Sequence, residues 1–202
     1  MVPMKSSPPG LSGFLSGWVK RKRMVRALPL INPEDFVLDL GCGLGEIVPL
    51  LPEGVNYMGV DRDSYMVEHN REVYPGFSFL LSDLASDPFP EGPWTVILCL
   101  AVLEHLDDPL SFLKKCKPCM KEGGRVIITT PHPRTRLLHG WMSKMRLLSR
   151  HADEDHETFL HRPVLEKMAR EAGYAVQEYT PFLMGMNQFI VLKNSTPKNS
   201  PD

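Results

Sequence analysis

Short apolar runs rich in β-branched residues recur through the first two thirds of the chain, separated by polar or helical stretches. Runs of this kind predict strands, and five of them lie at residues 36–40, 55–60, 77–81, 94–100 and 125–130. The stretches between them predict three helices, at residues 44–51, 63–72 and 109–117. Continuously apolar strands that alternate with helices form parallel sheets covered on both faces, with right-handed crossovers. The pattern therefore predicts a doubly wound α/β fold.

A different pattern follows Thr130. An insert over about residues 131–162 includes a predicted helix at 134–148, and its apolar residues suit either a lid over a small ligand or the core. Beyond it we predict one helix and two strands, at residues 163–172, 174–179 and 187–192. Because only a few residues join these two strands, they should pair antiparallel. The complete prediction is a Rossmann-like seven-stranded sheet with a final antiparallel strand and helices on both faces.

The N-terminal region is basic. Apolar residues from Leu11 onward fall at helical spacing and predict an amphipathic helix that ends near Pro29. Before Glu34 the chain carries six basic residues and no acid, so this region has a charge of +6 and the remainder −7, for a net charge of −1. Such a cluster suits contact with anionic lipid or nucleic acid, although a solvated helix face is the more common interpretation.

Length and composition bound the organisation of the chain. With 202 residues, 43% of them hydrophobic and 23% charged, the sequence suits one globular domain and not a disordered chain. We divide it into a basic N-terminal arm and helix at residues 1–33, one α/β domain at 34–193 and a disordered tail at 194–202. No apolar stretch approaches the ~18–20 residues of a membrane helix, and no signal-peptide pattern is present. Four cysteines are too few for a disulfide scaffold, so we expect a cytoplasmic protein.

The candidate chemistry begins where the first predicted strand ends. Asp39 is followed by glycines at alternate positions, Gly41, Gly43 and Gly45, which let the backbone approach a ligand closely. A dinucleotide-binding loop needs its third glycine one residue later, where Glu46 stands and would repel a pyrophosphate. No P-loop pattern is present either. The loop therefore points to a ligand without phosphates.

Two further acids follow the next two predicted strands. Asp61 stands twenty-two residues after Asp39, where an acid accepts both hydroxyl hydrogens of a ribose. Asp83 follows the third strand and suits the exocyclic amine of an adenine. An adenosyl ligand that tolerates acids and lacks phosphates fits S-adenosylmethionine (SAM), whose sulfonium is positive.

The sequence resembles the class I SAM-dependent methyltransferases, in particular the type 11 small-molecule group. The resemblance covers about residues 34–193, and its motifs are VLDLGCGLGE at 37–46, GVDRD at 59–63, LLSDLA at 80–85, LAVLEHLDDP at 100–109 and KEGGRVIITTP at 121–131. The chain departs from the family at two places. Trp94 and Thr95 replace the acid usual at the start of the fourth strand, and Pro49 shortens the first helix.

The resemblance implies a role for each motif residue, with SAM as the cofactor and S-adenosylhomocysteine (SAH) as the product. Gly41, Gly43 and Gly45 would line the methionine part, and Asp39 would orient the loop or the amino group. The remaining implied contacts are Asp61 and Arg62 with the ribose, Asp83 and Leu84 with the adenine, and Leu100 below the sulfonium. The alternative for most of these residues is ordinary turn and cap chemistry.

Methyl transfer from SAM is an in-line displacement, in which the protein aligns the acceptor and manages one proton. Histidine suits the proton transfer because its pKa lies near working pH. The candidates for the base are His105, His132 and His156, and the alternative is simple alignment without a base. We predict no metal site, since Cys116 and Cys119 have no partner pair at zinc-site spacing.

The acceptor is narrowed by motifs that the sequence lacks. Leu100 to Leu103 replace the (D/N)PP(Y/F) of amine methylation in DNA, and no Pro-Cys nucleophile is present there, so nucleic acid is an unlikely substrate. We predict transfer to a small molecule, with oxygen of a sugar, a lipid intermediate or another metabolite as the acceptor. Gly185 to Phe189 and the basic first helix motivate a peripheral membrane contact. The alternatives are a catalytically silent SAM-fold partner subunit and an NAD-dependent oxidoreductase, and the oligomeric state stays open.

Overall fold

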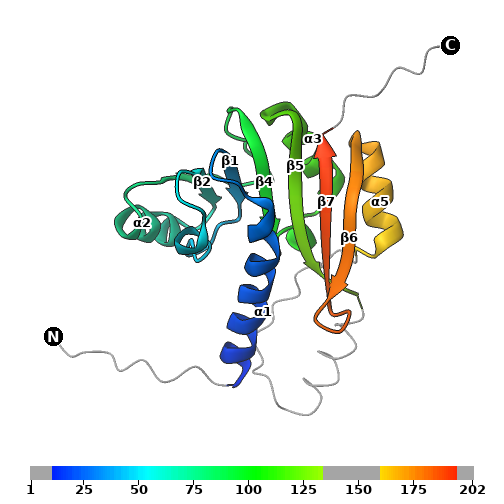
Figure 1. Ribbon diagram of the computed structural model, residues 1–202, viewed down its shortest axis with the longest axis horizontal. Helices are drawn as coiled ribbons and strands as arrows, with labels where there is room; N and C mark the ends of the chain where they lie inside the picture. The colour runs from blue at the N-terminus through cyan, green and yellow to red at the C-terminus, as the bar shows by residue number, and fades with distance from the viewer. Residues whose placement is uncertain (1–10, 134–159, 195–202) are drawn as a thin grey trace.

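The computed structural model describes residues 11–133 and 160–194, and its strands form one mixed sheet (Figure 1). The strand order is β3-β2-β1-β4-β5-β7-β6. The helices are α1 (Leu11–Ala27), α2 (Ser64–Val73), α3 (Pro109–Cys119) and α5 (Arg162–Glu171), with 3-10 turns η1 (Leu28–Leu30), η2 (Val48–Leu50) and η3 (Leu103–His105). The strands are β1 (Phe36–Leu40), β2 (Asn56–Asp61), β3 (Ser78–Leu81), β4 (Trp94–Leu100), β5 (Met120–Pro131), β6 (Tyr174–Phe182) and β7 (Asn187–Asn194).

The predicted seven-stranded, doubly wound sheet is confirmed. β1 to β5 run parallel to one another, and β7 runs antiparallel to both β5 and β6. The antiparallel pair of final strands follows from their short connection, which returns the chain at once beside itself. The chain leaves β1 toward β2 on one side and crosses to β4 on the other, so the strand order reverses at β1.

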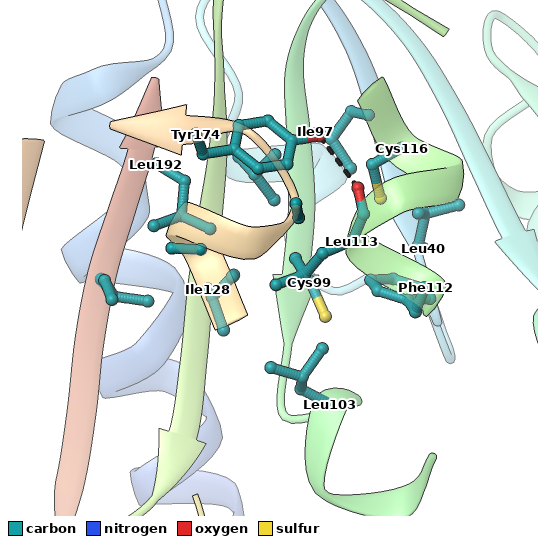
Figure 2. Packing of buried hydrophobic residues seen from close by; sticks show 14 of the residues in the cluster. Leu40, Ile97, Cys99, Leu103, Phe112, Leu113, Cys116, Ile128, Tyr174 and Leu192 are labelled. Carbon is teal, nitrogen blue, oxygen red and sulfur yellow. Dashed lines mark hydrogen bonds between the residues drawn. The ribbon is translucent and has the colours of Figure 1, made fainter. Parts of the chain in front are cut away.

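Each face of the sheet carries its own hydrophobic layer, because successive side chains of a strand point to opposite faces. Ile127 belongs to the layer beneath α1 and α2, and Ile128 belongs to the layer beneath α3 and α5. Figure 2 shows the second layer, where the Tyr174 hydroxyl donates to the Leu113 carbonyl oxygen at 3.1 Å. The helices on both faces, as predicted, thus bury the two sides of an almost wholly apolar sheet.

The predicted helix at residues 44–51 is wrong. The segment instead forms successive turns with hydrogen bonds from Gly45 N to Cys42 O and from Val48 N to Gly45 O, followed by η2. Two residues explain the difference. Gly45 has a φ of +64°, outside the helical region, and Pro49 has no backbone N–H for a helical hydrogen bond. The glycine loop is therefore followed by a tight turn and not by a regular helix.

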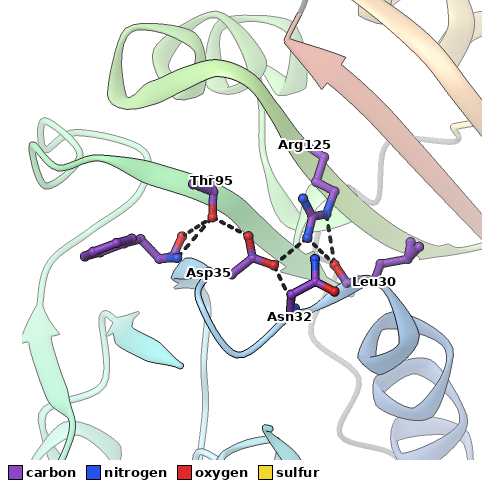
Figure 3. A network of polar contacts seen from close by, with 6 residues as sticks. Leu30, Asn32, Asp35, Thr95 and Arg125 are labelled. Atoms are coloured by element: carbon purple, nitrogen blue, oxygen red, sulfur yellow. Dashed lines mark hydrogen bonds and ion pairs between the residues drawn. The ribbon is translucent and has the colours of Figure 1, made fainter. Parts of the chain in front are cut away.

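The amino end of the sheet is closed by a polar network around Asp35 (Figure 3). Its carboxylate accepts hydrogen bonds from Thr95 Oγ1 at 2.6 Å and from Asn32 N at 2.8 Å, and it pairs with Arg125 at 2.5 Å. Arg125 also donates to the Leu30 carbonyl oxygen, at the end of η1. Thr95, at the start of β4, thus holds the carboxylate of Asp35, which directly precedes β1.

Several sequence predictions fall outside the described residues. These are the helix at 134–148, most of the insert at 131–162, and residues 195–202 of the predicted tail. Asn194, the first residue of that tail, ends β7. Within the part of the chain that the structure describes, no helix has both the length and the apolar character needed to span a membrane.

Candidate functional site

The glycine loop lies at the reversal point of the sheet, where doubly wound folds bind their ligands. Gly41 N and Cys42 N both donate to the Val60 carbonyl oxygen, at 2.8 and 3.0 Å, so the end of β2 holds the loop against the sheet. Gly41 has a φ of +80°, and a Cβ on it would lie 2.4 Å from Val102 Cγ2. Only glycine fits at this position, because the backbone packs directly against the segment after β4.

Asp61 binds the glycine loop directly. Its carboxylate accepts from Gly43 N at 2.8 Å and from Asp63 N at 3.1 Å. A carboxylate offers about four lone-pair sites, so the two ribose hydroxyls predicted for Asp61 still have acceptors. The structure thus brings together two features that the sequence places eighteen residues apart, the middle glycine and the acid after β2. Arg62, the second predicted ribose residue, is exposed.

Asp39 is buried beneath the loop. It accepts a hydrogen bond from the Tyr57 hydroxyl at 2.8 Å, and burial raises the pKa of its carboxyl to about 6. The Tyr57 hydrogen bond and the charge of Lys20 favour the ionised form, whereas the charge of Asp61 opposes it. Sequence reasoning found Asp39 but not Tyr57, which follows the strand pattern and gives no separate signal. The result is a buried carboxyl that gains from a cationic ligand.

Gly45 differs from the other two glycines. A Cβ on Gly45 would lie 3.1 Å from Asn70 Oδ1 and 3.1 Å from Tyr74 Cε2, both on or just after α2. The Asn70 amide donates to the Gly43 carbonyl oxygen at 2.7 Å. Close packing against α2 therefore explains the third glycine without a ligand, and its predicted contact with the methionine part stays a prediction.

The adenine residues lie after β3. Asp83 is exposed, and its carboxylate accepts from Ala85 N at 2.9 Å, which is ordinary turn chemistry. Leu84 is half-buried against the layer beneath α3 and α5, and its carbonyl oxygen accepts from Lys115 at 3.1 Å. The segment after β3 thus offers an apolar side chain, Leu84, and an exposed acid, Asp83. Their contacts with the adenine stay predictions.

The end of β4 and the segment after it contain Leu100, Glu104 and His105. Leu100 is half-buried on the α1 side, and His105 is exposed at the end of η3. Glu104 is 4% exposed, and its Oε2 has no hydrogen-bond partner among the described residues. Burial raises the pKa of Glu104, and the charge of Arg23 on α1 opposes the rise. Of the adjacent pair, the acid and not the predicted His105 is the buried group.

The other two histidine candidates have different outcomes. His132 follows β5, is half-buried and donates its backbone N–H to the Met186 carbonyl oxygen at 2.8 Å. This bond joins the end of β5 to the connection between β6 and β7. His156 lies outside the described residues. The choice among the three histidines as the base stays a prediction.

Two cations of α1 reach the same edge of the sheet. Lys20 pairs with Glu46 of the glycine loop, and Arg23 Nε donates to Asn187 Oδ1 at 2.8 Å. A single basic run led sequence reasoning to favour a solvated helix face. The missed signal is their spacing, because Lys20 and Arg23 share the face of the buried Met24 and Ala27.

The residues at this edge fit the cofactor that the motifs imply. Asp39, Glu46 and Asp61 surround the glycine loop, and their charge suits the sulfonium and the amino group of SAM. A Cβ on Gly43 would make ordinary van der Waals contact with Lys20 Nζ, at 3.7 Å, so the ammonium group lies beside the loop. The acid after β2 already touches the loop, so one ligand can contact both.

The chain was compared with known proteins. The profile of a family described as a methyltransferase domain matches residues 18–179. A probable SAM-dependent methyltransferase of Mycobacterium tuberculosis is 30% identical over 120 residues, which cover 57% of this chain and 43% of the relative. A ubiquinone biosynthesis O-methyltransferase of Pseudomonas aeruginosa is 29% identical over 152 residues, covering 70% of this chain and 65% of the relative. The chain thus spans less than two thirds of each relative.

The fold has solved counterparts as well. Magnesium protoporphyrin IX methyltransferase of Synechocystis, whose structure holds bound SAH, superimposes with a TM-score of 0.70 at 16% identity. The match covers 95% of this chain and 90% of that protein. At this identity the likeness concerns the fold alone.

Proposed function

Because the chain belongs to the methyltransferase domain family, whose named relatives depend on SAM, we propose that it transfers a methyl group from SAM to an oxygen atom of a small molecule. The observation that carries the proposal is the hydrogen bond from Gly43 N to the Asp61 carboxylate, at 2.8 Å. It joins a glycine loop to the acid of the adjacent strand at the reversal point of the sheet. Asp39, buried beneath the same loop, adds a carboxyl that favours a cationic ligand.

The residues of the chain have to orient the reactants and accept one proton, because bound SAM supplies an already activated methyl group. The glycine loop and Asp61 orient the cofactor. The segment after β4 lies at the edge where the acceptor must meet the cofactor. One of the candidates His105, His132 and His156 takes the proton of a hydroxyl acceptor. The buried Glu104 lies in the same segment, where burial raises the pKa of its carboxyl.

Oxygen is the proposed acceptor atom for two reasons. The Pseudomonas relative is named an O-methyltransferase, and hydroxyl groups gain more from a histidine base than better nucleophiles do. A sugar, a lipid intermediate or another metabolite would present such a hydroxyl. Nucleic acid is not proposed, because the motif positions after β4 lack the residues of base methylation.

The acceptor assay uses methyl-labelled SAM with panels of hydroxyl, amine and activated-carbon compounds, and SAH release is the readout. Label transfer to hydroxyl compounds supports the proposal, and transfer to amines or carbon alone contradicts it. His105→Ala, His132→Ala and His156→Ala are then compared with His69→Ala on α2 as a control. Loss of turnover with unchanged SAM affinity identifies the base, and unchanged turnover in all three variants favours simple alignment.

The same experiment separates the two alternative functions. A catalytically silent partner subunit would bind SAM or SAH yet transfer no methyl group to any acceptor. An NAD-dependent oxidoreductase would bind a nicotinamide cofactor in its place, which direct titration with NAD would detect. The acids around the glycine loop disfavour that second alternative, because they would repel a pyrophosphate.

A contact with an anionic membrane surface is part of the proposal. The outward side of α1 combines Trp18, 43% exposed, and Val25, 47% exposed, with the exposed cations Arg21 and Lys22. Lys22 Nζ lies 5.7 Å from the centre of the Trp18 ring. A helix face that joins an aromatic residue with cations is typical of contact with anionic headgroups.

Co-sedimentation with vesicles of neutral lipid, with and without anionic lipid, tests this contact. We expect binding only with anionic lipid and its loss in Arg21→Glu/Lys22→Glu. Lys114→Glu/Lys193→Glu makes the same charge change away from α1 and should bind normally. Equal partition to both kinds of vesicle would refute the contact. The proposed compartment is the cytoplasm, since the four cysteines are all free thiols, as a reducing compartment favours.

A further inference from the structure

Lys20 brings an ammonium group from α1 to the glycine loop. Its side chain pairs with the carboxylate of Glu46, directly after the loop. Its Nζ lies 3.7 Å from the position that a Cβ on Gly43 would occupy. Its charge also opposes the rise that burial causes in the pKa of Asp39 beneath the loop. The ion pair with Glu46 and the short distance to Gly43 therefore place the ammonium of Lys20 beside the middle glycine.

The position of Lys20 is set by the way α1 docks on the sheet. Met24 and Ala27, one and two turns further along the helix, are buried in the layer beneath it. Arg23 Nε donates to Asn187 Oδ1 at 2.8 Å, and Arg26 pairs with Glu178 at 3.3 Å. In Figure 1, α1 lies along the sheet, with its N-terminal half at the edge at which the parallel strands end and its C-terminal end toward the starts of these strands. Lys20 is thus held at the loop by contacts that do not depend on a ligand.

The acids around the glycine loop can attract the positive groups of SAM but not its carboxylate. The amino-acid end of SAM carries an ammonium and a carboxylate, and Asp39, Glu46 and Asp61 attract the first and repel the second. A carboxylate bound beside these acids needs a cation within hydrogen-bond reach. Lys20 meets this need, because an ammonium has three N–H donors and its pairing with Glu46 does not use them all.

We propose that Lys20 binds the carboxylate at the amino-acid end of SAM, and that Glu46 positions the Lys20 ammonium for this contact. The inference rests on the proposed function, since it concerns the same site. It assigns a cofactor contact to the N-terminal helix, outside the motifs that carry the family resemblance. Binding of the cofactor then adds a contact between α1 and the glycine loop.

The test compares two ligands that differ in the amino-acid end alone. SAH carries this end, whereas 5′-methylthioadenosine keeps the adenosine and the sulfur but lacks the amino acid. Both are titrated calorimetrically into the wild-type protein, Lys20→Met, Lys20→Arg and Lys22→Met. Lys22→Met removes the same charge two residues away, on the outward face of the same helix, and so controls for net charge.

We expect Lys20→Met to weaken SAH binding about tenfold, the loss typical of one hydrogen bond to a charged group. Binding of 5′-methylthioadenosine should stay unchanged in every variant, Lys20→Arg should keep most of the SAH affinity, and Lys22→Met should behave as the wild type.

Two results would overturn the inference while leaving the proposed function intact. In the first, Lys20→Met binds SAH as the wild type does. In the second, it loses affinity for both ligands equally, which indicates a structural role for Lys20. Failure of the wild-type protein to bind either ligand would instead contradict the proposed function itself, and the inference with it.

Discussion

Two aspartates at opposite ends of β1 have opposite surroundings. Asp35, just before the strand, accepts hydrogen bonds from Thr95 and Asn32 and pairs with Arg125 (Figure 3). Asp39, near the end of the strand, is equally buried, but burial raises the pKa of its carboxyl to about 6. The same residue type is thus stabilised at one end of the strand and destabilised in its charged form at the other.

The contrast extends beyond the two aspartates. The buried side-chain atoms that lack a hydrogen-bond partner within the described ranges are Asn70 Oδ1, Glu104 Oε2, Thr129 Oγ1 and Thr130 Oγ1. Asn70 contacts the glycine loop, and the other three follow β4 or lie near the end of β5. All four therefore lie toward the carboxyl ends of the parallel strands, here called the carboxyl edge. The opposite end of the sheet, around Asp35, is called the amino edge. Unsatisfied buried polar groups cost stability, and proteins keep them mainly where they serve function. The buried carboxylate of the amino edge is thus paired within the protein, and the unpaired groups of the carboxyl edge support the proposal that this edge binds the ligand.

The largest loss of stability is expected from a substitution at the amino edge. Asp35→Asn removes the negative charge from a mostly buried ion pair and leaves Arg125 without its counter-ion. We expect the free energy of unfolding to fall by about 3 kcal/mol, the low end for such pairs because Arg125 is partly exposed. Urea unfolding at pH 7 measures the loss. A change below the experimental error would show that the network does not stabilise the fold.

The matching substitution at the carboxyl edge, Asp39→Asn, should raise the free energy of unfolding instead of lowering it. A carboxyl whose pKa rises on folding, here from 3.8 to about 6, binds more protons in the folded chain, so wild-type stability falls as pH rises through that range. Asp39→Asn removes this loss and still accepts from Tyr57. We expect it to exceed wild-type stability by up to about 3 kcal/mol at pH 8.

The advantage of Asp39→Asn should shrink toward pH 4, where the wild-type carboxyl is protonated as well. Urea unfolding of both proteins at pH 4, 6 and 8 follows the difference. A variant that is less stable than the wild type at pH 8 would show that the charged carboxyl is well accommodated, and the contrast between the two aspartates would fail.

A third pair isolates the close contact of the glycine loop. Gly41→Ala and Gly123→Ala share a strained φ, +80° and +76°, but only the first places a Cβ against Val102. Strain at positive φ costs about 1 kcal/mol in both variants. We expect Gly41→Ala to lose about 1 to 2 kcal/mol more, by overpacking. Gly41→Ala/Val102→Ala should recover much of this extra loss, and no recovery would argue against the contact.

The smallest effects concern two threonines. Thr129→Val removes an unpartnered buried hydroxyl at nearly constant shape, and we expect the protein to gain up to about 1 kcal/mol. Thr95→Val removes the hydroxyl that donates to Asp35 and should lose about 1 to 2 kcal/mol. Thermal unfolding at pH 7 compares the two variants with the wild type. Equal losses of stability in Thr129→Val and Thr95→Val would contradict the contrast between the two edges.

Much of this arrangement is predictable from the sequence, because apolar periodicity determines which segments form the sheet. The strands, their order of appearance and the glycine loop followed by Asp61 were all recognisable. The helix expected at residues 44–51 was not formed, since local backbone limits at Gly45 and Pro49 outweigh its apolar spacing. A backbone restriction at a single position can therefore prevent a helix that the apolar pattern predicts.

The site was predictable only where one short segment carries it. Tyr57, Lys20 and Arg23 reach the site from other elements, and no local motif links them to it. At the opposite end of β1, Asp35 likewise meets its partner Thr95 through a contact between strands. Contacts between distant segments depend on register and helix docking, which periodicity alone does not determine.

SAM is expected to bind at the carboxyl edge of the sheet. Calorimetric titration with SAM and SAH tests this site most directly, in the wild type, in Asp61→Ala and in Glu53→Ala, which changes an exposed acid outside the site. We predict micromolar binding by the wild type and by Glu53→Ala, and none by Asp61→Ala. Absence of binding by the wild type, or unchanged binding by Asp61→Ala, would contradict it.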